Sequence, residues 1–168
     1  MRERARSIGE DPDALPRLYA RIINDAISPR PDGMTVAIHL CRGNFRSSWV
    51  AEGGYEPVAE ALFNELDVDG YFLEYDDERS GDFAPLRFVP KGKIVVLGII
   101  SSKLAALEGK DELKTRLDEA AKYMPLEQMA LSPQCGFSST VDGNEISVDD
   151  EIAKLKLAVE TAAEVWGS

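Results

Sequence analysis

The stretch Lys93-Ile-Val-Val-Leu-Gly-Ile-Ile100 is an unbroken apolar run, and it decides the fold class. A run of this kind is typical of a strand that is buried on both faces of a parallel sheet. Three more strand-like segments lie along the chain, at residues 34–41, 71–75 and 129–132. Apolar residues at helical spacing predict helices between and around these strands, over residues 11–28, 55–66, 111–124 and 147–167. This alternation of strands and helices is the rhythm of βα units that build a parallel sheet.

We therefore predict an α/β protein with one domain over residues 1–168: a leading helix within residues 1–31, then four parallel βα units over residues 34–168. A complete (β/α)8 barrel takes about 250 residues, so this chain has room for four of the eight strands. The four units would then correspond to the C-terminal half of such a barrel. A half-barrel has two exposed sheet edges, which proteins usually pair or cover. We expect the chain to need an N-terminal half-barrel or to associate with a second copy.

Composition excludes several classes of protein. The formal net charge is −11, whereas proteins that bind nucleic acid carry basic faces. No apolar run approaches the roughly 18 residues of a membrane-spanning helix, and the N-terminus has charges but no apolar signal region. Two cysteines do not make a disulfide framework and fit a reducing compartment. We expect a cytoplasmic protein that binds neither nucleic acid nor membranes.

Metal-ligating side chains stand at the carboxyl ends of the predicted strands. His39 and Cys41 close the first strand and share one face, Glu74 and Asp76 close the second, and Cys135 follows the fourth. In parallel α/β folds the active site is built by the loops that follow the strands. A His, two Cys and a Glu make a plausible four-ligand zinc set. A disulfide between Cys41 and Cys135 is an alternative use of the same geometry, and a lone His or Cys is often structural.

Several motifs make the sequence similar to a known family. They are His39-Leu-Cys41-Arg-Gly-Asn44, Phe72-Leu-Glu74-Tyr-Asp76, Val95-Val-Leu-Gly98 and Leu131-Ser-Pro-Gln-Cys135-Gly136. Over about residues 30–168 the chain resembles the C-terminal catalytic barrel of cobalamin-independent methionine synthases, and more closely their shorter single-barrel relatives, within the uroporphyrinogen decarboxylase and methionine synthase-like superfamily. The resemblance implies a (β/α)8 barrel with zinc at its C-terminal mouth, held by His39, Cys41, Glu74 and Cys135.

The resemblance also implies an activity. It is the transfer of a methyl group from a methylfolate to the thiol of homocysteine, which gives methionine (a 5-methyltetrahydropteroyl(tri)glutamate–homocysteine S-methyltransferase-like reaction). Zinc would deprotonate the acceptor thiol, and thiolate is the nucleophile. Two alternatives stay open: zinc-dependent alkyl transfer to another small thiol, and a non-catalytic half-barrel with a structural zinc site.

The chain departs from the family at several points. The resemblance implies a start in mid-barrel, because the family's acidic motif that grips the amino acid substrate lies upstream of the strand that ends in His39 and Cys41, and residues 1–34 do not match it. Larger members use a second His in proton transfer, whereas His39 is the only His in this sequence. Candidates for the catalytic work are Asp76, Ser101, Ser102 and Lys103. Candidates for substrate binding are Arg42, Asn44 and Gln134, and aromatic rings that could stack on a pterin or simply pack are Trp49, Tyr75 and Phe137.

Overall fold

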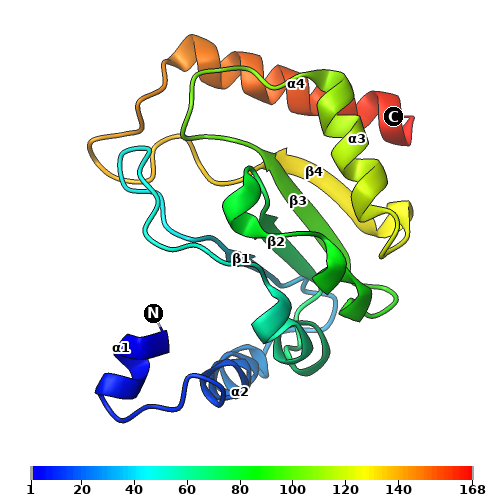
Figure 1. Cartoon of the computed structure of the whole chain (residues 1–168). Helices are drawn as coiled ribbons and strands as arrows, with labels where there is room; N and C mark the ends of the chain where they lie inside the picture. Colours follow the sequence, from blue (N-terminus) through cyan, green and yellow to red (C-terminus); the bar gives the residue numbers. More distant parts are fainter. Residues whose placement is uncertain (1, 168) are drawn as a thin grey trace.

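The computed structural model describes residues 2–167, which contain one sheet of four parallel strands (Figure 1). The strands are β1 (Ala37–Leu40), β2 (Gly70–Glu74), β3 (Ile94–Ile100) and β4 (Met129–Pro133). Their order in the sheet equals their order in the chain, and each neighbouring pair is parallel. A segment of a (β/α)8 barrel has this arrangement. The prediction of an α/β fold built from parallel βα units is therefore confirmed.

Among the described residues, four α-helices accompany the sheet: α1 (Arg2–Ser7), α2 (Leu15–Ile27), α3 (Lys110–Ala120) and α4 (Val148–Trp166). A capping box starts α4, because the Ser147 hydroxyl accepts the Asp150 N–H and the Asp150 carboxylate accepts the Ser147 N–H. No helix within residues 2–167 has both the length and the apolarity to cross a bilayer.

The segment expected to form one regular helix over residues 55–66 is helical but irregular. It contains a 3-10 helix at Glu56–Val58 and a π-helix at Ala61–Glu65. The apolar residues that suggested the helix are nevertheless buried, among them Leu62, Phe63 and Leu66. This face can be buried by an α-helix or by a mixture of 3-10 and π-helix. The apolar spacing therefore located the helix without specifying its hydrogen-bonding pattern.

The two faces of the sheet differ sharply in exposure. On β2, Tyr71 and Leu73 are at most 1% exposed, whereas Phe72 between them is 41% exposed. On β3, Val95 is fully buried, whereas Ile94 is 40% exposed. Since alternate residues of a strand point to opposite faces, one face packs in the core, and the other is open at Phe72 and Ile94 but buried at Glu74 and Ile100. An open apolar face is what the interior wall of an incomplete barrel would show.

Gly98 lets β3 approach the end of β4. A Cβ at this position would lie 2.6 Å from the Cα of Gln134 and 2.9 Å from the carbonyl oxygen of Leu73, so backbone would have to move. We expect Gly98→Ala to lower the free energy of unfolding by about 1–3 kcal/mol through overpacking. Urea denaturation measures this, with Gly109→Ala as the control, because a Cβ there meets nothing closer than 3.7 Å. Equal losses in the two variants would contradict the expectation.

Candidate metal centre

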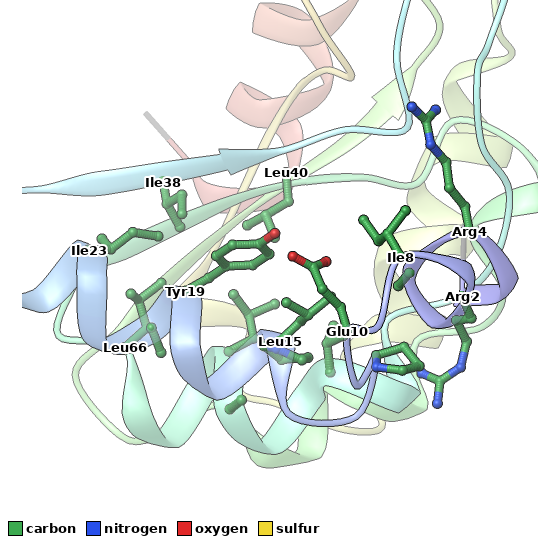
Figure 2. A pocket seen from close by; sticks show the side chains of 17 residues that line it. Arg2, Arg4, Ile8, Glu10, Leu15, Tyr19, Ile23, Ile38, Leu40 and Leu66 are labelled. Atoms are coloured by element: carbon green, nitrogen blue, oxygen red, sulfur yellow. The ribbon is translucent and has the colours of Figure 1, made fainter.

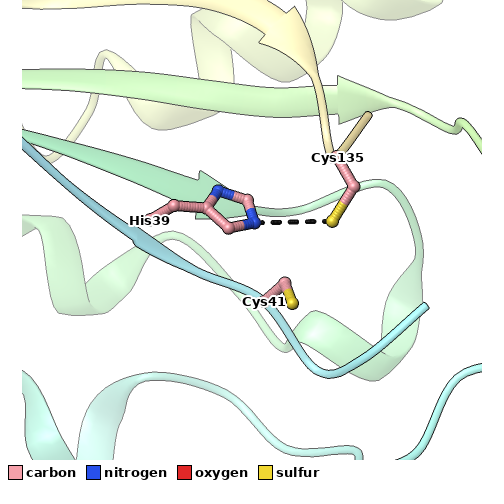
Figure 3. A group of neighbouring side chains, drawn as sticks. All are labelled: His39, Cys41 and Cys135. Atoms are coloured by element: carbon pink, nitrogen blue, oxygen red, sulfur yellow. Dashed lines mark hydrogen bonds between the residues drawn. The ribbon is translucent and has the colours of Figure 1, made fainter. Parts of the chain in front are cut away.

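Three metal-ligating side chains converge at the carboxyl ends of the two outer strands (Figure 3). His39 belongs to β1, Cys41 follows it, and Cys135 follows β4. One donor atom from each lies within 4.8 Å of the others, and His39 Nε2 is 3.4 Å from Cys135 Sγ. In a flat sheet, three strand spacings would separate β1 from β4 by about 14 Å. The sheet is therefore strongly curved, and this curvature assembles the group.

The loop after β1 depends on a glycine. Gly43 has φ 89°, and a Cβ there would lie 2.7 Å from the Val50 side chain. Its N–H donates to Cys41 Sγ at 3.4 Å and so helps to hold the sulfur in place. Cys41 and Cys135 are both free thiols, so the disulfide alternative is not the state that the structure shows.

The surroundings of the donors fix their protonation. Burial is the main cause that raises the pKa of Cys135 to about 12, and the neighbouring Cys41 adds to it. Burial also lowers the pKa of His39, against the opposing influence of Glu74. The imidazole is therefore neutral near pH 7 and has a free lone pair, whereas the Cys135 thiol keeps its proton until a cation displaces it. Two sulfurs and one imidazole nitrogen form a donor set suited to zinc.

Zinc binding should consequently depend on pH. A cation must displace the Cys135 proton, and the whole range from pH 6 to 8 lies below the pKa of about 12. We expect the zinc affinity to rise with pH, by about tenfold per pH unit for this one proton. Competition with a chromophoric chelator at pH 6, 7 and 8 measures it, and the released protons are counted in weak buffer. An affinity that does not change over this range would contradict the expectation.

The fourth predicted ligand, Glu74, lies beside this group but is engaged elsewhere. Its side chain is fully buried at the end of β2. Oε1 accepts a hydrogen bond from Lys103 Nζ at 2.7 Å, and Oε2 accepts the backbone N–H of Arg42. The charge of Glu74 opposes the lowering of the His39 pKa and adds to the raising of the Cys135 pKa, so it lies within electrostatic reach of the donors.

Three of the candidate catalytic residues, Asp76, Ser101 and Lys103, lie in a buried network around Glu74. Asp76 Oδ2 accepts from Ser101 Oγ at 2.9 Å and from Lys103 Nζ at 3.1 Å. Burial raises the pKa of Asp76, although the Lys103 charge opposes this. Ser102 is turned away from these groups, because its N–H and hydroxyl both donate to Gln134 Oε1.

The candidate substrate-binding residues are likewise held by the protein. The Arg42 guanidinium donates to the carbonyl oxygens of Gly53 at 2.7 Å and Glu74 at 2.9 Å. Gln134 is 1% exposed, and Asn44 Nδ2 is 3.5 Å from the Ser102 hydroxyl. These side chains connect the loops after the strands.

Sequence reasoning missed the role of Tyr55. Its hydroxyl donates to the Leu40 carbonyl oxygen at 2.9 Å and accepts the Glu74 N–H at 2.8 Å, which ties the ends of β1 and β2 together. Its ring lies 4.4 Å from the Arg42 guanidinium. The apolar spacing of residues 55–66 placed Tyr55 only on a helix face. The one sequence signal that could have indicated its role between β1 and β2 is its hydroxyl group.

The aromatic candidates differ in exposure. Tyr75 is fully buried between Tyr55 and Phe83, with ring centroids 5.2 and 4.7 Å away, so it packs in the core. Trp49 is 48% exposed and lies 4.7 Å from the Arg79 guanidinium. Of these two rings, only Trp49 offers surface to a ligand.

A curved parallel sheet that collects sulfur and imidazole donors at its carboxyl edge has the arrangement of part of an α/β barrel with a candidate metal site. Comparison with known proteins makes this specific. Residues 21–164 match the family described as the catalytic domain of cobalamin-independent synthases, and the chain therefore belongs to that family.

The relatives are longer than this chain. The uncharacterised protein YxjH of Bacillus subtilis is 50% identical over 166 residues, which cover 98% of this chain and 44% of YxjH. The 5-methyltetrahydropteroyltriglutamate–homocysteine methyltransferase of Bacillus licheniformis is 25% identical over 136 residues, 81% of this chain and 16% of the enzyme. A crystal structure from Listeria monocytogenes, provisionally assigned as a vitamin-B12-independent methionine synthase, has 39% identity and a TM-score of 0.74 over 95% of this chain and 44% of its own. The chain thus spans less than half the length of each.

Proposed function

We propose that this chain is the metal-binding half of a zinc-dependent methyltransferase, which transfers a methyl group from a methylfolate to the thiol of homocysteine and so forms methionine. The observation that carries the proposal is the convergence of His39, Cys41 and Cys135 at the carboxyl mouth of the curved sheet. Membership of the cobalamin-independent synthase family supports it, as does the similarity to the Bacillus licheniformis methyltransferase.

In this proposal His39, Cys41 and Cys135 hold zinc, and Glu74 is the fourth ligand. Zinc at this position would keep an acceptor thiol in its reactive thiolate form. His39 contributes a neutral lone pair, since its lowered pKa keeps the ring unprotonated. The Gly43 N–H orients the Cys41 sulfur, and the Arg42 N–H orients the Glu74 carboxylate.

Substrate contacts are proposed to come largely from outside these 168 residues. Arg42, Gln134 and Lys103 are buried and hydrogen-bonded within the protein, so we assign them to positioning the donors. Proton transfer would then use water or a group from the other half of the barrel, because the chain has no second His.

The partner that we propose is a half-barrel equivalent to the N-terminal part of the longer relatives. Among the described residues, β1 pairs with β2 alone and keeps one free edge. Beside β1 lies an apolar cavity of about 570 Å³ between α2 and the strand, lined by Tyr19, Ile23, Ile38 and Leu40 among others (Figure 2). A preceding βα unit would pair with this edge and fill this cavity. A second copy of the chain is the alternative occupant, and the greater length of the relatives favours the N-terminal half.

A methyl-transfer assay tests the proposal. The reaction contains homocysteine, a methyltetrahydrofolate and the zinc-loaded chain, with and without a separately produced N-terminal half. Methionine formed only by the combined halves supports both the activity and the partner. Stoichiometric zinc with no methyl transfer by the combined halves would instead favour a structural zinc site.

A further inference from the structure

The segment between β3 and α3, residues 101–109, forms neither helix nor strand, and we call it the β3–α3 loop. Its first three residues are buried, whereas residues 104–107 are all exposed, with exposed fractions of 64% for Leu104 and 54% for Leu107. Figure 1 shows this loop running beside α4 on its way to α3. Because its apolar side chains in this part face solvent, polar contacts must fix the course of the loop.

The polar contacts from α4 come from Lys154, whose side chain has an exposed fraction of 0%. Its Nζ donates to the Ala106 carbonyl oxygen at 2.6 Å, to Glu108 Oε2 at 2.9 Å and to Glu108 Oε1 at 3.1 Å. Glu108 Oε1 in turn accepts the backbone N–H of Ser101 at 2.8 Å. Lys154 and Glu108 thus tie the beginning and the end of the β3–α3 loop to α4.

The beginning of the same loop reaches the candidate metal centre. Ser101 Oγ donates to Asp76 Oδ2 at 2.9 Å. Lys103 Nζ donates to Glu74 Oε1 at 2.7 Å and to Asp76 Oδ2 at 3.1 Å. A shift of the loop would therefore move two hydrogen-bond donors away from the carboxylates that they orient.

We propose that Lys154 is a positioning residue, which acts through Glu108 to hold the β3–α3 loop against the candidate metal centre. The inference rests on the proposed function, because it gives Lys154 a part in the same site. The action is indirect: the contacts run from Lys154 to Glu108, from Glu108 to the Ser101 N–H, and from the Ser101 hydroxyl to Asp76.

The burial of the ion pair supports a role in positioning. Lys154 shares the buried face of α4 with Leu157 and Ala158. Replacing a buried ion pair by apolar side chains of similar size is often neutral or stabilising, so packing of α4 alone does not require a lysine here. An apolar pair could not accept the Ser101 N–H or donate to the Ala106 carbonyl oxygen, and these are the two contacts that fix the loop.

Hydrogen exchange on the 168-residue chain tests the inference. We compare the wild type with Lys154→Met, Glu108→Met and the double variant, and we measure the exchange rate of the Ser101 amide relative to the amides of β3. This ratio should rise at least about tenfold in each variant, because the amide loses its acceptor or the anchor of that acceptor. In the Glu108→Met background, Lys154→Met should add no further increase, since Lys154 acts through Glu108.

Lys156→Met is the matched control, because Lys156 is a 73% exposed lysine of the same helix that pairs only with Glu160 on the surface. It should leave the ratio unchanged. The double variant leaves no buried charge unpaired and should be about as stable as the wild type. Where Lys154→Met does not fold by circular dichroism, the double variant and Glu108→Met decide.

A second measurement uses methyl transfer by the combined halves of the barrel. The double variant should retain one zinc per chain, because His39, Cys41 and Cys135 lie outside the β3–α3 loop. Its kcat should nevertheless fall at least about tenfold, since the loop no longer orients the site. If the ion pair served stability alone, the double variant would regain both stability and activity.

The possible outcomes separate the two proposals. Combined wild-type halves that transfer no methyl group overturn the proposed function, and the exchange at Ser101 still decides whether Lys154 holds the loop. An exchange ratio in Lys154→Met, or in the double variant, that equals the wild-type ratio overturns the role of Lys154. Wild-type activity in the double variant also overturns it.

Discussion

Replacing Cys135 with serine should weaken zinc binding at least about 100-fold. Changes in groups that only support metal ligands cost 10–100-fold, so the loss of a ligand should cost no less. The Cys135 sulfur follows β4 and lies 3.4 Å from His39 Nε2. The neighbouring thiol, Cys41, is already a member of the donor group and so does not replace it. A serine hydroxyl is a poor zinc ligand because it does not ionise near neutral pH. Chelator competition under reducing conditions measures the affinity.

Ser138→Ala serves as the matched control for this variant. Ser138 is exposed in the same loop, and its hydroxyl bonds only to the Thr140 carbonyl oxygen. Removal of this hydroxyl should leave the zinc affinity within about threefold of the wild-type value, because Ser138 does not support a metal ligand. Equal affinities in the wild type and Cys135→Ser would remove Cys135 from the site.

Methyl transfer should require both halves of the barrel. We expect only background methionine from the 168-residue chain alone, and at least about 100-fold more product after co-expression with the part of YxjH that this chain does not match, which we propose to be its N-terminal half. The reason is orientation, because misplacing a substrate by about 1 Å lowers the reaction rate about 100-fold. This chain holds the donors but leaves the facing wall of the barrel open. Radiolabelled methyltetrahydrofolate gives the required sensitivity.

Two controls make this experiment specific. The combined halves carrying Cys135→Ser should be inactive, which ties the product to this chain rather than to the added half. Light scattering should show one copy of each half in the complex. Full activity from the 168-residue chain alone, or from a dimer of this chain without the other half, would contradict the proposed partner.

Much of the fold could be read from the sequence because its signals are local. The apolar run at Ile94–Ile100 and the helical spacing before Trp166 depend only on which residues must be buried, and both elements formed as expected. The capping box at Ser147 and Asp150 is also a local pattern. The type of helix near Phe63 was not predictable, since burial of its face does not specify the hydrogen-bonding pattern.

The candidate site was predictable in part. The ends of parallel strands meet at one edge, so His39, Cys41 and Cys135 could be expected to approach one another, and they do. The partners of Glu74 could not be predicted, because they depend on the length and direction of Lys103 across a strand boundary. The hydrogen bond from the Tyr55 hydroxyl to the Leu40 carbonyl oxygen could not be predicted either, because it joins residues that are distant in the sequence and no sequence spacing indicates it.

The zinc content of the purified, reduced wild-type chain tests the central claim most directly. Elemental analysis after removal of loosely bound metal should find about one zinc per chain, since His39, Cys41, Cys135 and Glu74 all belong to these 168 residues. A chain that is folded by circular dichroism, and yet retains no zinc after reconstitution at pH 8, would contradict the account.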